Sequence, residues 1–159
     1  MSLAIEKVLA PATGQPFQPR VEQADQKLNI VVVFTSVEST LAALKEAGNL
    51  AASLGARITL LVPQVVPYPL PLESPPILVD FNEKRFKVIA SESPVETNVQ
   101  IYLCRDPFET VVSALKPGSL VVLGGRKRWW PATWWSTREK RLASKLRRAG
   151  HEVVFKETE

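Results

Sequence analysis

Apolar residues along the chain form short runs that are separated by segments with helical spacing. Residues 29–35 (NIVVVFT) and 57–62 (RITLLV) are continuous apolar runs, the pattern of strands that are buried on both faces of a parallel sheet. Residues 98–104 (NVQIYLC) alternate in part, and two further short runs occupy 120–123 (LVVL) and 152–156 (EVVFK). The pattern therefore predicts five strands.

A helix is predicted in each of the four intervals between these strands. In the first interval, Gly55 is well placed to end a helix. Asp80 and Glu83 have the spacing of a capping box, with Asp in the cap role, for a helix that runs through Glu92. The apolar face of the first helix consists of Leu41, Leu44, Ala47, Ala51 and Leu54.

The other two helices also have recognisable first turns. Asp106-Pro107 is a strong helix start, since Asp caps a helix and Pro fits its first turn. Ser136 and Glu139 have capping-box spacing before the segment that Gly150 closes. The chain therefore alternates strand and helix from residue 29 to residue 156.

This alternation predicts the fold class. We expect an α/β domain with a three-layer, Rossmann-like open parallel sheet of five strands and helices on both faces. Ligands bind such sheets at the carboxyl ends of the strands, near the point where the strand order reverses. The predicted ligand edge contains Thr35-Ser36, Val62-Pro63 and the loop after Leu123.

Two segments lie outside this pattern. Residues 1–26 are rich in Pro, Gln and Ala and have weak periodicity, so we expect an N-terminal extension, with the α/β domain spanning residues 27–159. Residues 63–76 contain six Pro. We expect this segment to run extended over the surface, because Pro interrupts both sheet and helix.

Composition excludes several kinds of site. With one Cys (Cys104) and one His (His151), the chain has no intrachain disulfide and no Cys-based or His-cluster metal site. No apolar run approaches the roughly 20 residues of a membrane-spanning helix, and the first fifteen residues do not resemble a signal peptide. A cytoplasmic location is therefore expected.

The positive charge is concentrated in one block. The net charge is +4, but residues 126–148 contain nine Lys or Arg and one Glu, and all four Trp fall within residues 129–135. A single-sign block beside a Trp cluster is typical of a partner surface. The surface predicted on this basis consists of Arg126, Lys127, Arg128, Trp129, Trp130, Trp134 and Trp135.

Residues 27–156 resemble the universal stress protein family. The resemblance rests on the Pro-rich stretch after the second strand, on Cys104-Arg105-Asp106-Pro107 at the start of the third helix, and on residues 119–126 (SLVVLGGR). The last segment is similar to the family's fourth strand running into its phosphate loop. The order and spacing of these features agree with the family throughout.

Many members of that family bind ATP, but this chain departs from their pattern. The first strand usually ends in Asp, where Thr35 stands here. The phosphate loop usually reads G-x-x-G, nine residues, then G-[ST]; Gly124 fits the first Gly, Lys127 replaces the second, and the third is missing near residues 135–137. By resemblance, the positions that would contact a nucleotide are Thr35, Val62, Gly124, Gly125, Arg126 and Ser136.

The sequence thus favours a non-catalytic regulatory or interaction module with a degenerate nucleotide site. Its homodimer would form through the strand Glu152–Lys156, as the resemblance also implies, and we expect no cofactor. We do not expect an enzyme, because no general base or metal-binding carboxylate lies at the predicted edge, although weak ATPase activity stays open. The main alternative is an ATP-binding stress-response switch.

The Trp/Arg-rich segment 126–148 leaves further alternatives open. Its Trp side chains would fill the nucleotide space or cover a dimer interface, as bulky apolar groups. Alternatively, the Trp side chains and the neighbouring Lys and Arg side chains would together contact an anionic membrane surface or a protein partner. Nucleic acid is the least favoured partner, since the rest of the domain is acidic.

Overall fold

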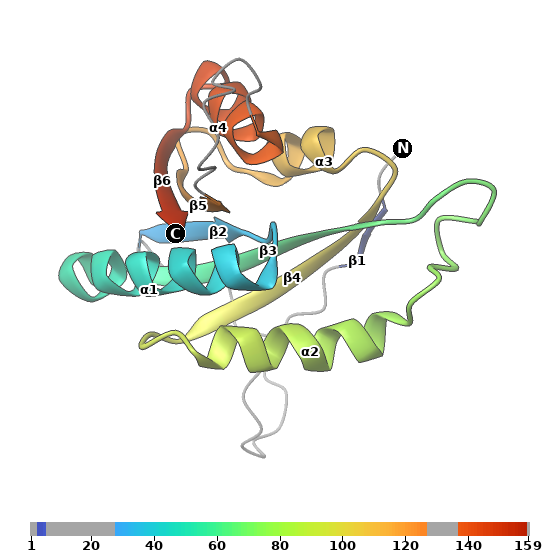
Figure 1. The fold of residues 1–159 in the computed structure, drawn as a ribbon, viewed down its shortest axis with the longest axis horizontal. Helices are drawn as coiled ribbons and strands as arrows, with labels where there is room; N and C mark the ends of the chain where they lie inside the picture. Colours follow the sequence, from blue (N-terminus) through green and yellow to red (C-terminus); the bar gives the residue numbers. More distant parts are fainter. Residues whose placement is uncertain (1–2, 6–27, 127–136, 159) are drawn as a thin grey trace, which may run out of the picture.

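Six strands form one sheet in the part of the chain that the computed structural model describes, residues 3–5, 28–126 and 137–158 (Figure 1). Their order is β1-β4-β3-β2-β5-β6. The five strands from β2 to β6 are parallel, which confirms the predicted sheet. The strands are β1 (Leu3–Ile5), β2 (Asn29–Val33), β3 (Arg57–Val65), β4 (Thr97–Cys104), β5 (Leu120–Arg126) and β6 (Glu152–Thr158).

The sixth strand, β1, lies in the N-terminal extension and was not predicted. It pairs antiparallel with β4, placing Leu3 opposite Leu103 and Ile5 opposite Ile101. Three residues are too few to show a period, and the partner strand is about a hundred positions away in the sequence. Residues 6–27 of the extension lie outside the described residues.

Helices cover both faces of the sheet, as predicted (Figure 1). The first face packs against α1 (Val37–Leu54) and α2 (Val79–Ser91), and the second against α3 (Pro107–Ala114) and α4 (Arg138–Arg148). Alternate residues of β2 belong to different cores: Ile30 and Val32 to the first, Val31 and Val33 to the second. All four side chains are buried, which explains why this strand is a continuous apolar run. No helix among the described residues is long and apolar enough to cross a membrane.

Two helix boundaries confirm their sequence signals. Gly55 ends α1 in the left-handed region with φ +62°, and its N–H donates to the Ala51 carbonyl. Asp106 caps α3, because its carboxylate accepts hydrogen bonds from the N–H groups of Phe108 at 2.8 Å and Glu109 at 3.1 Å. Pro107 occupies the first turn of that helix.

Two other cap predictions require correction. Leu78 is the N-cap of α2 and makes no side-chain cap hydrogen bond, so Asp80 lies inside the first turn. An acidic residue in the first turn also stabilises a helix, by its interaction with the helix dipole. Sequence spacing alone does not distinguish such a residue from an N-cap. The N-cap of α4 is Thr137, which accepts a hydrogen bond from the Lys140 N–H at 3.3 Å. Ser136, the predicted cap, lies outside the described residues.

The Pro-rich segment also begins later than predicted, because β3 continues through Pro63 to Val65. The Phe34 N–H donates to the Leu61 carbonyl, so odd-numbered residues of β3 face β2 in the alternating ladder. The last β2 residue paired with β3 is Val33, opposite Leu61. The nitrogen of Pro63 therefore points beyond the end of β2, where no ladder hydrogen bond is lost.

Candidate functional site

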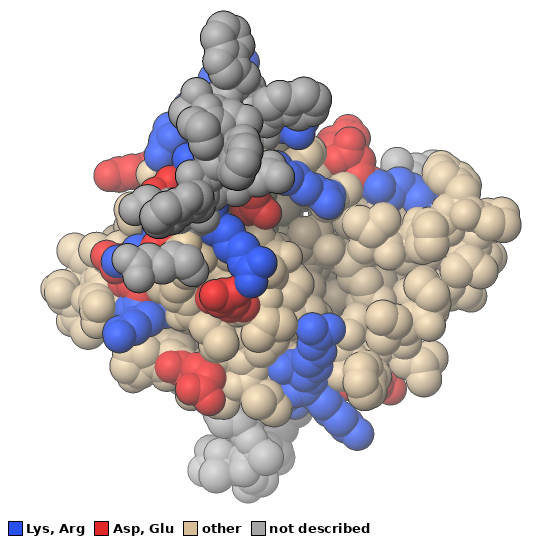
Figure 2. All heavy atoms as spheres, viewed as in Figure 1, with Lys and Arg blue, Asp and Glu red and all other residues tan. Residues whose placement is uncertain are grey.

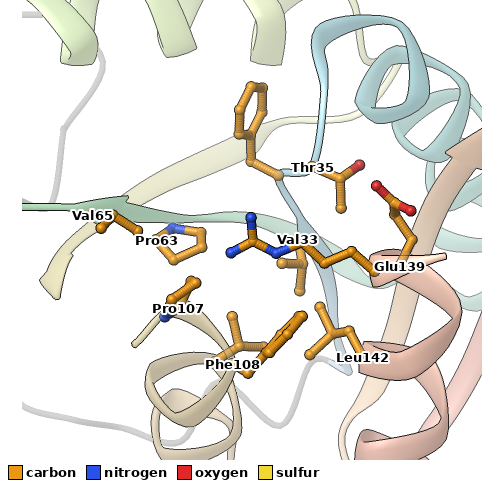
Figure 3. A pocket seen from close by; sticks show the side chains of 11 residues that line it. Val33, Thr35, Pro63, Val65, Pro107, Phe108, Glu139 and Leu142 are labelled. Carbon is orange, nitrogen blue, oxygen red and sulfur yellow. The ribbon is translucent and has the colours of Figure 1, made fainter. Parts of the chain in front are cut away.

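A cavity of about 240 Å³ opens at the carboxyl edge of the sheet (Figure 3). It lies between the ends of β2 and β3 and the first turns of α3 and α4. The strand order reverses beside it, because β2 has β3 on one side and β5 on the other. The cavity therefore occupies the place where open α/β sheets bind their ligands. Its volume lies below the roughly 300–1,000 Å³ of most ligand pockets.

The cavity walls are mostly apolar. Figure 3 shows Pro63, Val65 and Pro107 toward one end, and Thr35 and Glu139 at the other. The remaining polar lining residue is Arg138, whose guanidinium carbon lies 5.1 Å from the centre of the Phe108 ring. This is a cation–π distance. The cavity thus combines an apolar wall with one cationic, one acidic and one hydroxyl side chain.

Thr35, at the position where the family has Asp, links two strands. Its hydroxyl donates to the Gly124 carbonyl at 3.1 Å, and its N–H donates to the Thr40 hydroxyl at 3.2 Å. The first bond joins the end of β2 to β5 where the β2–β5 ladder has ended. Thr35 therefore has a structural role at this end of the sheet.

Gly124 and Gly125 lie inside β5, which corrects the prediction that a loop begins after Leu123. They pair with Lys156 and Glu157 of β6. Neither adopts a positive φ, so neither needs glycine for its backbone angles. A Cβ at Gly124 would overlap the Ser39 carbonyl group of α1, and a Cβ at Gly125 would lie 2.5 Å from Cζ of Phe155. Close packing explains both glycines.

The other predicted contact residues are more dispersed. Arg126 follows on β5 and forms an ion pair with Glu38, 2.7 Å long, with 73% of the arginine side chain exposed. Such an exposed pair contributes little stability. Val62 is 2% exposed and packs in the core beneath α1 and α2, so its side chain does not line the cavity. Seven predicted residues lie outside the described ranges: Lys127, Arg128, Trp129, Trp130, Trp134, Trp135 and Ser136.

The structure therefore places some of the predicted site residues in contact and identifies further residues that line the cavity. Thr35 and Gly124 are in direct contact. Phe108, Arg138 and Glu139 also line the cavity and were not proposed as site residues. The sequence does contain a signal that could have identified them. The two predicted helix starts each follow a strand of the same parallel sheet, so the first turns of both helices must lie at the same edge.

Cys104 and His151 lie apart from the cavity and are both buried. Burial raises the pKa of the Cys104 thiol; a hydrogen bond with Thr110 acts in the opposite direction, and the Asp106 carboxylate adds to the rise. His151 accepts a hydrogen bond at Nδ1 from the Ser119 N–H at 3.3 Å. Within the described ranges, no group of three or more His, Cys, Asp or Glu side chains is arranged to hold a metal ion.

Comparison with known proteins finds a similar structure but no similar sequence family. No protein-family model matches the sequence, and no curated protein matches it. Among solved structures, universal stress protein UspA from Lactobacillus plantarum is similar, with a TM-score of 0.50 and 18% sequence identity. The match covers 80% of this chain and 96% of that one. This chain therefore has a universal stress protein fold, as the sequence resemblance predicted.

Proposed function

We propose that the chain is a non-catalytic regulatory or interaction module with the universal stress protein fold and a degenerate nucleotide site. The supporting observation is the position of Gly124 and Gly125 inside β5, packed against α1 and Phe155. A phosphate cradle needs consecutive backbone N–H groups that converge on the anion, which glycine permits by leaving the backbone bare. These two glycines instead leave room for neighbouring protein atoms.

The cavity chemistry supports the same proposal. Thr35 provides a hydroxyl that already donates to Gly124, where a carboxylate would offer two acceptor oxygens. Phosphoryl transfer uses carboxylates that hold Mg²⁺ and a group that positions the nucleophile. Among the described lining residues, Glu139 is the sole carboxylate, and it follows Arg138 on α4. Recognition without catalysis is the activity that this arrangement supports best.

The alternative function is an ATP-binding switch. It is favoured by the location of the cavity, which lies where the strand order of the sheet reverses. Thermal unfolding with and without millimolar ATP and Mg²⁺ distinguishes the two. A ligand at 100 times its dissociation constant adds about 2.7 kcal/mol of stability, which is about 5–11 °C for a chain of this size. We expect no shift.

A shift of several degrees would overturn the degenerate-site proposal. The variant Arg138→Gln removes the cation that lines the cavity, while Lys116→Gln removes one that does not. Loss of the ATP-induced shift in the first variant but not in the second would assign the nucleotide to this cavity.

We also propose that the module forms a homodimer through β6, which is the last strand of the sheet. The Glu152 N–H donates to the Ser119 carbonyl of the neighbouring segment, so the N–H groups of Val153, Phe155 and Glu157 point away from β5. Arg147 donates to the Val153 carbonyl at 3.2 Å. The part of the edge nearest the carboxyl end of β6 is therefore the part available for pairing.

The dimer is tested by removing one outward N–H group. Glu157→Pro removes this donor, whereas Glu157→Ala removes the same side chain and keeps the donor. In light scattering after gel filtration, we expect wild type and Glu157→Ala at twice the 17.6 kDa of the chain and Glu157→Pro at the monomer mass. A wild-type monomer at all concentrations, or a dimer that Glu157→Pro leaves intact, would contradict pairing through this edge.

A further inference from the structure

The outward face of α4 carries a row of four basic side chains, Arg138, Arg141, Lys145 and Arg148. Their spacing of three, four and three residues places them along one side of the helix. All four are exposed. At 1.5 Å of rise per residue, the row is about 15 Å long. It is therefore a linear, solvent-facing array of positive charge, which we call the α4 row.

The buried side chains of α4 fix this orientation. Leu142, Ala143 and Leu146 are at most 4% exposed and pack into the second core. The other two basic residues of the helix lean toward β6: Lys140 forms a 3.0 Å ion pair with Glu157, and Arg147 reaches the Val153 carbonyl. Rotation of the helix would expose the apolar anchors, so Arg141, Lys145 and Arg148 are held facing outward. Arg138, at the first turn, is exposed but leans over Phe108 at the mouth of the cavity.

The α4 row has no acidic partner within the described part of the chain. No ion pair or side-chain hydrogen bond joins any of the four side chains to another described residue, and the Arg138 guanidinium contacts the Phe108 ring in the lining of the cavity. Like charges at these spacings destabilise a helix. The helix dipole favours the cations near the C-terminal end but opposes Arg138 and Arg141 in the first turn. Helix stability therefore does not explain the row.

The shape of this region favours an extended anionic surface. Figure 1 shows α4 in the outer layer of the molecule, and Figure 2 shows Lys and Arg side chains in the upper part of the view, with Asp and Glu side chains among them. The row runs along a convex helix, which a flat surface meets along its whole length. No large apolar residue of α4 is exposed, so the helix offers no aromatic platform for stacking nucleic-acid bases.

We propose that the α4 row docks this protein on anionic lipid surfaces by electrostatic attraction, without insertion into the bilayer. Each Lys or Arg near such a surface strengthens binding about fivefold. Four together give an increase on the order of several hundredfold. The attraction falls off over a Debye length of about 8 Å at physiological salt, so the binding weakens steeply as salt is added.

The test is sedimentation of the full chain with vesicles of phosphatidylcholine, with and without 30% phosphatidylserine. Changing all four residues of the α4 row to Gln should reduce binding to the anionic vesicles at least a hundredfold. A control variant carries the same charge change elsewhere, at Lys45, Lys84, Arg85 and Lys116, which are all exposed. The control should retain binding to within about tenfold of wild type.

A third variant, with Arg138, Arg141 and Arg148 all changed to Lys, keeps the charge and should keep most of the binding. Thermal unfolding of each variant shows that it is folded. Equal losses in the row and control variants would overturn the proposal in favour of net charge alone. Equal binding to neutral vesicles, no binding to anionic vesicles, or binding to short DNA or RNA but not to vesicles would each also overturn it.

Discussion

Adding one methyl group at Gly124 tests whether this residue is needed for packing or for a phosphate loop. The Cβ of Gly124→Ala would lie 2.5 Å from the Ser39 carbonyl carbon and 3.0 Å from its Cα. Carbon atoms in contact are normally about 3.5–4.0 Å apart. The first turn of α1 would therefore have to move by about 1 Å, and Ser36 and Thr40 hold that turn in place through cap and backbone hydrogen bonds.

The expected cost follows from this obstruction. Extra carbon in a packed core costs about 1–3 kcal/mol, and here the obstacle is backbone, which cannot rotate away. Replacing Gly by Ala in a strand recovers about 0.5–1 kcal/mol. We expect Gly124→Ala to lose about 2 kcal/mol of unfolding free energy, or about 4–8 °C in Tm for a chain of this length.

Gly125→Ala is the matched control on the next residue. Its Cβ meets the tip of the Phe155 ring at 2.5 Å, with the adjacent ring carbons at 3.3 Å. A partly exposed side chain can tilt away, so the loss should stay below about 1 kcal/mol. Adding Phe155→Leu to Gly125→Ala should give a coupling that offsets part of the two separate losses.

Urea unfolding at 25 °C, with Tm as a second readout, measures these differences. An unchanged stability of Gly124→Ala would refute the packing explanation and restore the loop interpretation of this residue. So would a loss in Gly125→Ala as large as that in Gly124→Ala, because a flexible ring and a fixed backbone would then be equivalent obstacles.

Two further changes test other parts of the structure. Arg105 donates hydrogen bonds to the carbonyls of Val66 and Leu70, both at 2.6 Å, and its guanidinium stacks on the Tyr68 ring at 4.2 Å. Arg105→Ala should therefore lower the free energy of unfolding by about 2 kcal/mol. It should also speed proteolytic cleavage within residues 66–78. Lys116→Ala should leave the cleavage pattern unchanged, and an unchanged pattern in Arg105→Ala would contradict the anchoring role. Burial raises the pKa of the Cys104 thiol, so the stability gained by burying the neutral thiol is complete below the unfolded thiol's pKa and is lost as pH rises through the folded value. The difference in unfolding free energy between wild type and Cys104→Ala should stay constant from pH 6 to 8 and shrink above about pH 9, and a difference that grows with pH would contradict this.

Most of the sheet could be predicted because its signals are local. Continuous apolar runs mark the strands, and the cap at Asp106 and the stop at Gly55 operate within a few residues of themselves. Predictions failed where a distant segment decides the outcome. The three residues of β1 have no pattern of their own and depend on pairing with β4. Pro63 stays in a strand because β2 has already ended beside it.

The candidate site was harder to predict for the same reason. A Gly-Gly pair after a strand is typical of a phosphate loop, but the need for glycine here comes from Ser39 and Phe155, which the sequence does not place beside it. Val62 was expected at the ligand edge, yet its side chain faces the first core. The cavity itself depends on where α3 and α4 begin in space, so Phe108 and Arg138 were not identified as its lining.

The two edges of the sheet differ in the order in which the ribosome makes them. The β1 residue Leu3 pairs with Leu103 of β4, so the covering strand precedes the edge that it covers by a hundred positions, about 5–20 s at a synthesis rate of 5–20 residues per second. When β4 emerges, its edge can be closed at once, before it pairs with another nascent chain. Strand β6 forms the opposite edge of the sheet, and in the described part of the chain none of the strands made before it lies along its outer side to close it in this way.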